Sequence, residues 1–161
     1  MAEFLSEKDK RTHYCGTLRT EDEGKEVVVC GWTQRQRDLG GLIFIDLRDR
    51  TGIVQLAFDD NTDKEIFDKA FTVRSEFVLM AQGKVRRRSS VNKDIPTGEI
   101  EIEVTTLKIL GKAETPPFDI SDDTKANEEL RLKYRYLDLR RSCLQKNIMT
   151  RQTIREYTNE Q

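Results

Sequence analysis

Three side chains of different chemistry, Phe44, Gln55 and Glu101, share one alternation phase in three short apolar stretches of the sequence. An aromatic ring such as that of Phe44 can stack on any nucleobase, which stabilises binding by about 1–3 kcal/mol per base. The amide of Gln55 offers a donor and an acceptor to the pairing edge of a base. The carboxylate of Glu101 can accept from an exocyclic amine such as that of cytosine. Together these residue types favour the binding and reading of single-stranded nucleic acid.

Alternation places these three side chains on the outside of the strands that carry them. Successive side chains of a strand point to opposite faces, so a wholly apolar phase must face the core. That phase consists of Ile43, Ile45, Leu47, Val54, Leu56, Phe58, Ile100, Ile102 and Val104. Phe44, Gln55 and Glu101 then face outward, alongside Asp46 and Arg48. The alternative is that a loop covers Phe44 and that the charged residues are ordinary surface.

The polar end of an earlier strand, VVVCGWTQRQRD, could add guanidinium groups to the same surface. The apolar set that we expect in the core of this strand is Val28, Cys30 and Trp32. The opposite phase carries Thr33, Arg35 and Arg37, so both arginines are predicted to face outward, where they could hold phosphates. Gln36, between them, has the inward phase.

A basic cluster follows later in the chain, with no acidic residue inside it. It consists of Lys84, Arg86, Arg87, Arg88 and Lys93. The net charge of the whole chain is −1, so bulk electrostatics do not predict a nucleic-acid partner. The cluster is either a solvated loop or a phosphate-binding rim, and the second interpretation makes Lys84, Arg86, Arg88 and Lys93 candidate phosphate contacts.

The pattern of short strands indicates the fold that must position these residues. The predicted strands cover about residues 27–38, 42–49, 53–58, 77–88 and 99–110, and a short helix covers 62–73. Five strands with a helix between the third and fourth are the order of an OB-fold, a mainly β Greek-key barrel. Its usual role is to bind oligonucleotides or oligosaccharides, which is an analogy from fold.

The chain has 161 residues, enough for one domain of ordinary size and an extension. We expect the OB-fold domain to cover residues 1–110, with a polar, frayed start at 1–12. A linker with two prolines and several acids covers 111–126, and helical segments with a weak apolar stripe cover 127–161. A helical tail without a second core predicts the start of a further domain.

Several classes of protein are excluded by composition. The longest apolar runs fall far short of the ~18 residues of a membrane span, and the N-terminus has no apolar signal region. The three cysteines are far apart and predict a reduced, cytoplasmic setting. The only histidine is His13, so no zinc site is expected, and we predict neither a metal site nor a catalytic residue in this chain.

Four segments carry a resemblance to a known family: YCGTLR, CGWTQRQRDLGGLIFIDLRDRTGIVQ, TGEIEI and LRLKYRYLDLRR. They resemble the N-terminal region of bacterial-type aspartyl-tRNA synthetases, which are class II aminoacyl-tRNA synthetases. The resemblance runs from about Tyr14 to the C-terminus. Lysyl and asparaginyl relatives share the barrel and pieces such as YLDLR, but they resemble the hairpin segment less.

The resemblance implies roles in reading an anticodon. Phe44 matches an aromatic residue that stacks in the anticodon, Gln55 a glutamine that reads the central uracil, and Glu101 a glutamate that reads the final cytosine. The residues matching the basic turn at Arg35, Arg37 and Asp38 contact the first base and the nearby backbone. The family often has an unbroken arginine triplet where this chain has Gln36, so a phosphate contact is in question there.

For the complete enzyme the resemblance implies ATP-dependent attachment of aspartate to its tRNA, with ATP and Mg²⁺ as cofactors, in a cytoplasmic homodimer. The motifs that grip ATP lie beyond these 161 residues, so this part is expected to bind the anticodon and to catalyse nothing. Some relatives also charge asparagine tRNA. That choice depends partly on the position of Leu39 and on the loop near Ser90 and Val91, and Leu39 favours aspartate alone.

Two other functions remain open for an OB-fold of this kind. One is a free-standing protein that binds single-stranded nucleic acid, although the linker and the segment YRYLDLRR argue against it. The other is an OB-fold module that binds a protein, which would need no selectivity for RNA. Comparison of cognate and scrambled anticodon stem-loops separates the alternatives.

Overall fold

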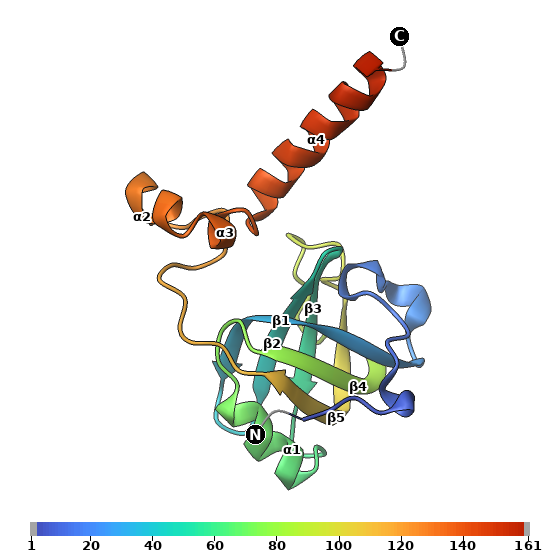
Figure 1. Ribbon diagram of the computed structural model, residues 1–161. Coiled ribbons are helices and arrows are strands. Elements are labelled where there is room, and N and C mark those ends of the chain that lie inside the picture. Colours follow the sequence, from blue (N-terminus) through green and yellow to red (C-terminus); the bar gives the residue numbers. More distant parts are fainter. Residues whose placement is uncertain (1–2, 160–161) are drawn as a thin grey trace. The chain divides into compact units, whose positions relative to one another are not determined.

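The computed structural model describes residues 3–159, which divide into two compact units, one ending at Thr115 and the other beginning at Pro116. The first unit contains a closed barrel of five strands in the order β1-β2-β3-β5-β4 (Figure 1). The strands are β1 (Glu26–Asp38), β2 (Ile43–Asp49), β3 (Gly52–Phe58), β4 (Val78–Arg87) and β5 (Ile100–Gly111). Helix α1 (Lys64–Thr72) connects β3 to β4. The predicted OB-fold, with its helix between the third and fourth strands, is confirmed.

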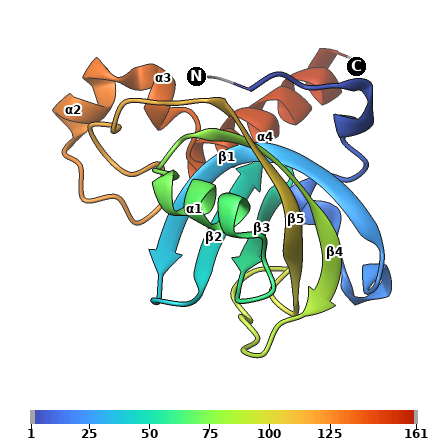
Figure 2. The same cartoon turned by 90° about the horizontal axis from the view of Figure 1, so that it is seen from below.

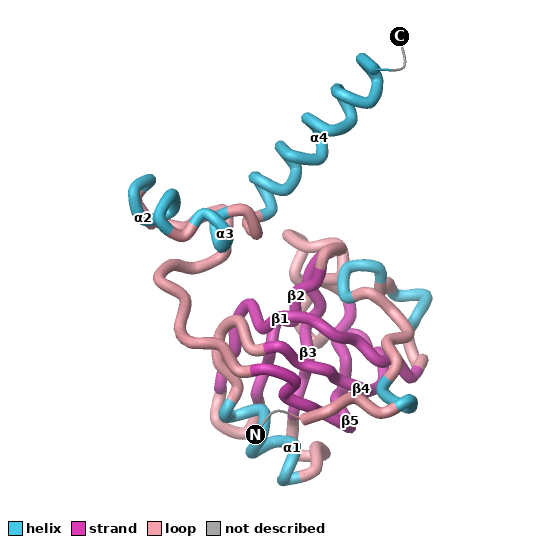
Figure 3. The backbone as a smooth tube through the Cα atoms, viewed as in Figure 1, coloured by secondary structure: helices cyan, strands magenta, loops and turns pink. Residues whose placement is uncertain are grey.

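Strand pairing explains how the barrel closes. β3 and β5 run parallel, whereas β1–β2, β1–β4, β2–β3 and β4–β5 are antiparallel pairs. Figure 3 shows the five strands, in magenta, gathered into the barrel. The short β2–β3 turn is stabilised by the Asp49 carboxylate, which accepts hydrogen bonds from the backbone N–H and the hydroxyl of Thr51. Gly52 follows with a φ of 148°, a conformation that suits glycine. The parallel pairing of β3 with β5 then brings together residues that are more than forty positions apart, such as Leu56 and Ile102.

The core is formed by the inward phases of the strands and by one face of α1. All nine residues that alternation assigned to the core of β2, β3 and β5 are buried, as predicted. In α1, Ala70 is fully buried, and Ile66 and Phe67 pack against the core cluster. Figures 1 and 2 show α1 lying across one end of the barrel. The helix begins at Asp63, whose side chain accepts from the backbone N–H of Glu65 and caps the first turn.

The predicted core face of β1 is wrong for Cys30 and Trp32, whereas Val28 is buried but lies outside the core cluster. Val27 and Val29 are fully buried in the core cluster, whereas Trp32 is 39% exposed and Cys30 is half-buried. Both phases of the first half of β1 are apolar, so alternation could not choose between them. Gly31 belongs to the inward phase, and its hydrogen faces the backbone of β2 so closely that a Cβ would lie 2.4 Å from a carbonyl oxygen.

A bulge then changes the phase of β1. Thr33 still has the inward phase and is buried inside the barrel. The pairing register with β2 shifts between Thr33 and Arg35, so Arg35 lies outside. The prediction for Thr33 is therefore wrong, while Arg35 and Arg37 face outward as expected. Gln36 keeps the inward phase, and its Nε2 donates to carbonyl oxygens at the C-terminal end of α1.

The N-terminal segment is not frayed from residue 3 onward. Glu3 exchanges hydrogen bonds with Ile109 of β5, and its carboxylate also pairs with Lys69 at 2.7 Å. Asp9 is buried and accepts from Lys108 at 2.7 Å. Short 3₁₀ turns at Glu7–Asp9, Cys15–Thr17 and Thr20–Asp22 then lead the chain into β1. The expectation of a frayed start failed because the side chains that dock it are all polar.

The second unit contains α2 (Glu128–Lys133), α3 (Arg135–Asp138) and α4 (Ser142–Asn159). Ion pairs within the YRYLDLRR segment connect these helices. The buried carboxylate of Asp138 accepts hydrogen bonds from Arg135 and Arg141, each at 3.0 Å. Arg141 also donates to the backbone oxygens of Ser121 and Asp122, which ties the extended segment to the start of α4. Within residues 3–159, no helix is long and apolar enough to cross a membrane.

The docked N-terminal segment predicts a specific loss of stability in acid. Hydrogen bonds from Lys108 and Ser6 lower the pKa of Asp9 from its usual value of 3.8 to about 2. A carboxyl group whose pKa is lowered on folding stabilises the protein above its unfolded pKa, and this contribution is lost as the pH falls through its folded pKa. The difference in unfolding free energy between the unaltered chain and Asp9→Asn should therefore be constant near neutral pH and shrink between about pH 5 and pH 2.

Urea titrations followed by circular dichroism at several pH values measure this difference. Glu7→Gln is the matched control, because it removes an exposed carboxylate from the same 3₁₀ turn and should change stability little. An Asp9→Asn difference that is the same at pH 2 and pH 6 would contradict the prediction.

Candidate nucleic-acid interface

Two parallel rows of outward side chains cross all five strands of the barrel. The first row consists of Arg35, Asp46, Gln55, Glu101 and Arg86, on β1, β2, β3, β5 and β4 respectively. The second row, in the same strand order, consists of Arg37, Phe44, Ala57, Glu103 and Lys84. The structure therefore brings the three residues singled out by their chemistry, Phe44, Gln55 and Glu101, onto one surface.

The amide of Gln55 is held from both sides. Its Nε2 donates to Oε2 of Glu101 at 2.7 Å, and its Oε1 accepts from Nη2 of Arg37 at 2.9 Å. Gln55 is only 4% exposed although it lies outside the barrel, because its neighbours in the rows cover it. These two bonds fix which end of the amide faces Glu101 and leave one N–H and one acceptor position for another partner.

The carboxylate of Glu101 is equally constrained. Oε2 accepts from Gln55, and Oε1 accepts from Nε of Arg86 at 2.8 Å. Glu101 is 6% exposed, so sequence alternation predicted its face correctly but could not reveal its burial. An ionised carboxylate has about four acceptor positions, so these contacts leave capacity for an amine from a ligand.

Arg86 is held by three carboxylates. Besides Glu101, its Nη1 lies 3.0 Å from Asp59 Oδ2 and 3.3 Å from Glu103 Oε1. Burial alone would lower the pKa of Arg86, but its hydrogen bonds with Glu101 and Asp59 raise the pKa above its usual value. Arg86 is therefore a permanent cation placed between acids, a role that its position in a basic sequence cluster did not reveal.

Phe44 is half-buried and borders Arg37. The guanidinium carbon of Arg37 lies 5.6 Å from the centre of the Phe44 ring, within range of a cation–π interaction. Nη2 of Arg37 also lies 3.2 Å from Asp46 Oδ1. On the other side of Phe44 in the second row stands Ala57, which has only a methyl group and is buried. The Phe44 ring thus has the guanidinium of Arg37 on one side and the small side chain of Ala57 on the other.

The other residues of the predicted β1 contact are arranged differently. Arg35 is exposed at the β1 end of the first row. Asp38 is exposed, and its Oδ1 accepts from the backbone N–H of Gly40 at 2.9 Å, so it stabilises the β1–β2 turn. Gly40 has a φ of 89°, which explains the glycine at this position. Leu39 is 65% exposed at the tip of the same turn.

The residues of the basic cluster differ in their exposure and in their partners. Lys84 and Lys93 are exposed. Arg88 is half-buried, and its backbone N–H donates to the carbonyl oxygen of Glu99. Arg87 pairs with Glu23 at 2.9 Å on the exposed side of β4. Ser90 and Val91 are both exposed in the loop between β4 and β5.

Sequence reasoning missed the acids that organise the site. Asp59 follows β3, and its Oδ1 accepts from the backbone N–H of Asn61 while Oδ2 holds Arg86. Asp46 was assigned to the outer face but not to a contact with Arg37. Cross-strand neighbours of this kind depend on the strand order, which local alternation does not contain.

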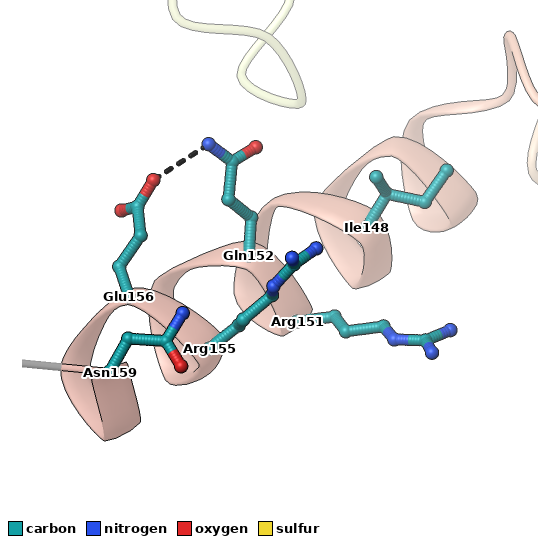
Figure 4. A pocket seen from close by; sticks show the side chains of 6 residues that line it. All are labelled: Ile148, Arg151, Gln152, Arg155, Glu156 and Asn159. Carbon is teal, nitrogen blue, oxygen red and sulfur yellow. Dashed lines mark hydrogen bonds between the residues drawn. The ribbon is translucent and has the colours of Figure 1, made fainter.

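Other features within residues 3–159 offer no comparable site. They contain no cluster of three or more His, Cys, Asp or Glu side chains placed to hold a metal ion. A shallow hollow on α4 is lined by Ile148, Arg151, Gln152, Arg155, Glu156 and Asn159 (Figure 4). All six residues come from one helix, and Gln152 donates to Glu156 across it at 2.8 Å.

Comparisons with known proteins identify the kind of domain. A sequence model of the OB-fold nucleic acid binding domain matches residues 27–110. The Aspartate--tRNA(Asp/Asn) ligase of Thermoanaerobacter sp. (strain X514) is 58% identical over 157 residues, which cover 94% of this chain and 26% of the relative. The Aspartate--tRNA ligase of Limosilactobacillus fermentum is 57% identical over 132 residues, which cover 82% of this chain and 22% of the relative.

A solved structure extends the comparison to the fold. The asparaginyl-tRNA synthetase from Pyrococcus horikoshii, complexed with asparaginyl-adenylate, superposes with a TM-score of 0.67 and 31% identity, covering 81% of this chain and 29% of that one. The chain thus spans about a quarter of the length of the curated relatives it matches. The resemblance noted from the sequence is confirmed.

The buried position of Glu101 predicts a measurable cost for its replacement. Glu101→Gln removes the charged acceptor of the Arg86 bond, and hydrogen bonds to charged groups contribute about 1.5–3 kcal/mol. We expect the free energy of unfolding to fall by about that amount without loss of the barrel. Glu103→Gln is the control, because the Glu103 side chain is 33% exposed and an exposed pair with Arg86 contributes at most about 1 kcal/mol. Urea unfolding measures both variants, and equal losses would contradict the assignment.

Proposed function

The chain belongs to the family of OB-fold nucleic acid binding domains, and we propose that it forms the anticodon-binding region of an aspartate–tRNA ligase. The observation that carries this proposal is the gathering of Phe44, Gln55 and Glu101 in two adjacent rows of one barrel surface. Close similarity to aspartate–tRNA ligases over 94% of the chain supports it. The partner is the anticodon stem-loop of aspartate tRNA.

Each of the three residues has a separate task in this proposal. Phe44 stacks on an anticodon base, and its bracing by Arg37 keeps the ring in place. Gln55 reads the central uracil, whose pairing edge offers both a donor and acceptors to an amide. Glu101 reads the final cytosine, whose exocyclic amine can donate to the remaining acceptor positions of the carboxylate.

The remaining proposed site residues contact the RNA backbone and, at the end of β1, the first anticodon base. Arg35 and Arg37 lie beside the reading residues, and with Asp38 they contact the first base and the neighbouring backbone in this proposal. The other proposed phosphate contacts are Lys84, Arg86, Arg88 and Lys93. Because Arg86 is already paired with three acids, it is the weakest phosphate candidate of this set.

The proposal for the complete protein follows its relatives. It is a cytoplasmic homodimer that uses ATP and Mg²⁺ to attach aspartate to tRNA, while the 161-residue chain binds the anticodon and catalyses nothing. Leu39, Ser90 and Val91 are the positions proposed to influence whether asparagine tRNA is also charged. Relatives named for aspartate tRNA alone and for both tRNAs are almost equally similar, at 57% and 58% identity, so overall identity does not decide the choice.

Binding to RNA stem-loops tests the proposal. The chain should bind the aspartate anticodon stem-loop more tightly than a stem-loop with a scrambled anticodon, as measured by fluorescence anisotropy. The affinity should fall with salt, with a log–log slope of about −0.7 for each phosphate contacted in a single strand. Equal affinity for both stem-loops would favour a general single-strand-binding protein, and no binding to either would favour a protein-interaction module.

Removal of the reading carboxylate should alter selectivity. A base-edge contact discriminates by about 1–3 kcal/mol in duplex DNA, and 1.4 kcal/mol corresponds to about tenfold. Glu101→Gln should therefore narrow the preference for cytosine over uracil at the final anticodon position by about tenfold. Dissociation constants for the two stem-loops measure this ratio, and an unchanged ratio in the folded variant would leave Glu101 without a reading role.

Removal of the stacking ring should act differently. Phe44→Ala is expected to weaken the cytosine and uracil stem-loops to a similar degree, because stacking depends little on base identity. The loss should be about 1–3 kcal/mol for each RNA. Leu42→Ala provides a control, since it shortens a neighbouring apolar side chain, 40% exposed, just before β2 begins. Equal effects of the two substitutions would contradict a stacking role for Phe44.

A further inference from the structure

Arg86 contacts Glu101 directly and, through Glu101, is linked to Gln55, so one arginine adjoins two of the residues proposed to recognise bases. Its Nε donates to Oε1 of Glu101 at 2.8 Å, while the other oxygen of Glu101 accepts from Gln55. The carboxylate is therefore held between a guanidinium on β4 and an amide on β3. Either oxygen of Glu101 can accept from the Gln55 amide, so the position of that amide depends on where the carboxylate is held.

Arg86 itself is anchored at a fixed point of the fold. Its Nη1 lies 3.0 Å from Oδ2 of Asp59, and Oδ1 of Asp59 accepts from the backbone N–H of Asn61 in the turn after β3. The Asp59 side chain is 15% exposed, so this anchor is largely shielded from solvent. A series of hydrogen bonds thus runs from a backbone turn through Arg86 and Glu101 to Gln55.

We propose that Arg86 is a positioning residue that sets the carboxylate of Glu101 and, through it, the amide of Gln55 for base recognition. This inference rests on the proposed anticodon-binding function. It replaces the phosphate-contact role that the basic sequence cluster suggests for this arginine. Its physical basis is that the guanidinium presents several donors in a fixed fork, so one side chain can hold Glu101 and Asp59 at the same time.

The consequence is that selectivity, rather than affinity, depends on Arg86. Without it, the carboxylate of Glu101 can rotate and shift, and the Gln55 amide, whose N–H group still donates to that carboxylate, shifts with it. Arg86→Gln should reduce the preference for cytosine over uracil at the final anticodon position by about tenfold, as Glu101→Gln does. The preference for uracil over cytosine at the central position should fall in parallel. A phosphate contact would instead weaken all stem-loops equally and make the salt slope shallower by about 0.7.

Three variants separate these roles. Arg86→Gln removes the fork and the charge, whereas Arg86→Lys keeps the charge but has a single rotatable ammonium group. Arg87→Gln is the matched control, since it removes a neighbouring charge that pairs with Glu23 instead. We expect Arg86→Lys to keep the salt slope of the unaltered chain and to restore less than half of the base selectivity that Arg86→Gln loses. Arg87→Gln should leave both base preferences unchanged. Full recovery by Arg86→Lys would overturn the positioning role.

A measurement without RNA makes failure of this inference distinguishable from failure of the proposed function. In the free protein, the side-chain amide signal of Gln55, assigned by NMR with Gln55→Glu, should shift and exchange faster with solvent in Arg86→Gln but not in Arg87→Gln. If the unaltered chain shows no base preference, the proposed function fails and the role in base reading fails with it. If base preference is present but neither it nor the Gln55 signal changes in folded Arg86→Gln, positioning by Arg86 is overturned and the anticodon function stands.

Discussion

The parallel pairing of β3 with β5 is the constraint on which the candidate nucleic-acid interface depends. It closes the barrel and places Gln55 beside Glu101, two residues that are 46 positions apart in sequence. The antiparallel pairs on either side then extend the same rows to β1, β2 and β4. A shift of one residue in this register would turn Glu101 into the core and bring an isoleucine to the surface, so the hydrophobic core and the candidate site are specified by the same pairing.

Local pattern predicted those parts of the fold in which one phase is clearly apolar. The hairpin of β2 and β3, helix α1 and the outward faces of Phe44, Gln55 and Glu101 follow directly from alternation and helical spacing. The core face of β1 could not be predicted, because both of its phases are apolar before Thr33 and because a bulge then changes the phase. The core face was chosen wrongly before the bulge, and the bulge reverses the phase after it. The predicted outward orientation of Arg35 and Arg37 is correct for that reason alone.

Burial and pairing of the site residues could not be predicted in the same way. Gln55 and Glu101 are covered by side chains from neighbouring strands, and no local pattern contains that information. Arg86 sits in a basic run of the sequence, yet its partners come from the end of β3 and the start of β5. Likewise, the N-terminal segment is polar in composition but docked, because Asp9 meets Lys108 and Glu3 meets Lys69 only in the folded chain.

Positive and negative side chains nearly balance on the two rows of the candidate interface. The two rows carry Arg35, Arg37, Lys84 and Arg86 against Asp46, Glu101 and Glu103, and Asp59 adds a fourth acid beside them. Such a surface exerts little net attraction on a polyanion, so stacking and base-edge contacts must contribute a large share of the affinity. The paired charges instead hold Gln55 and Glu101 in place in the free protein. In the proposed anticodon-binding role, less side-chain freedom is then lost on binding, so more of the energy of each base contact goes into discrimination between bases.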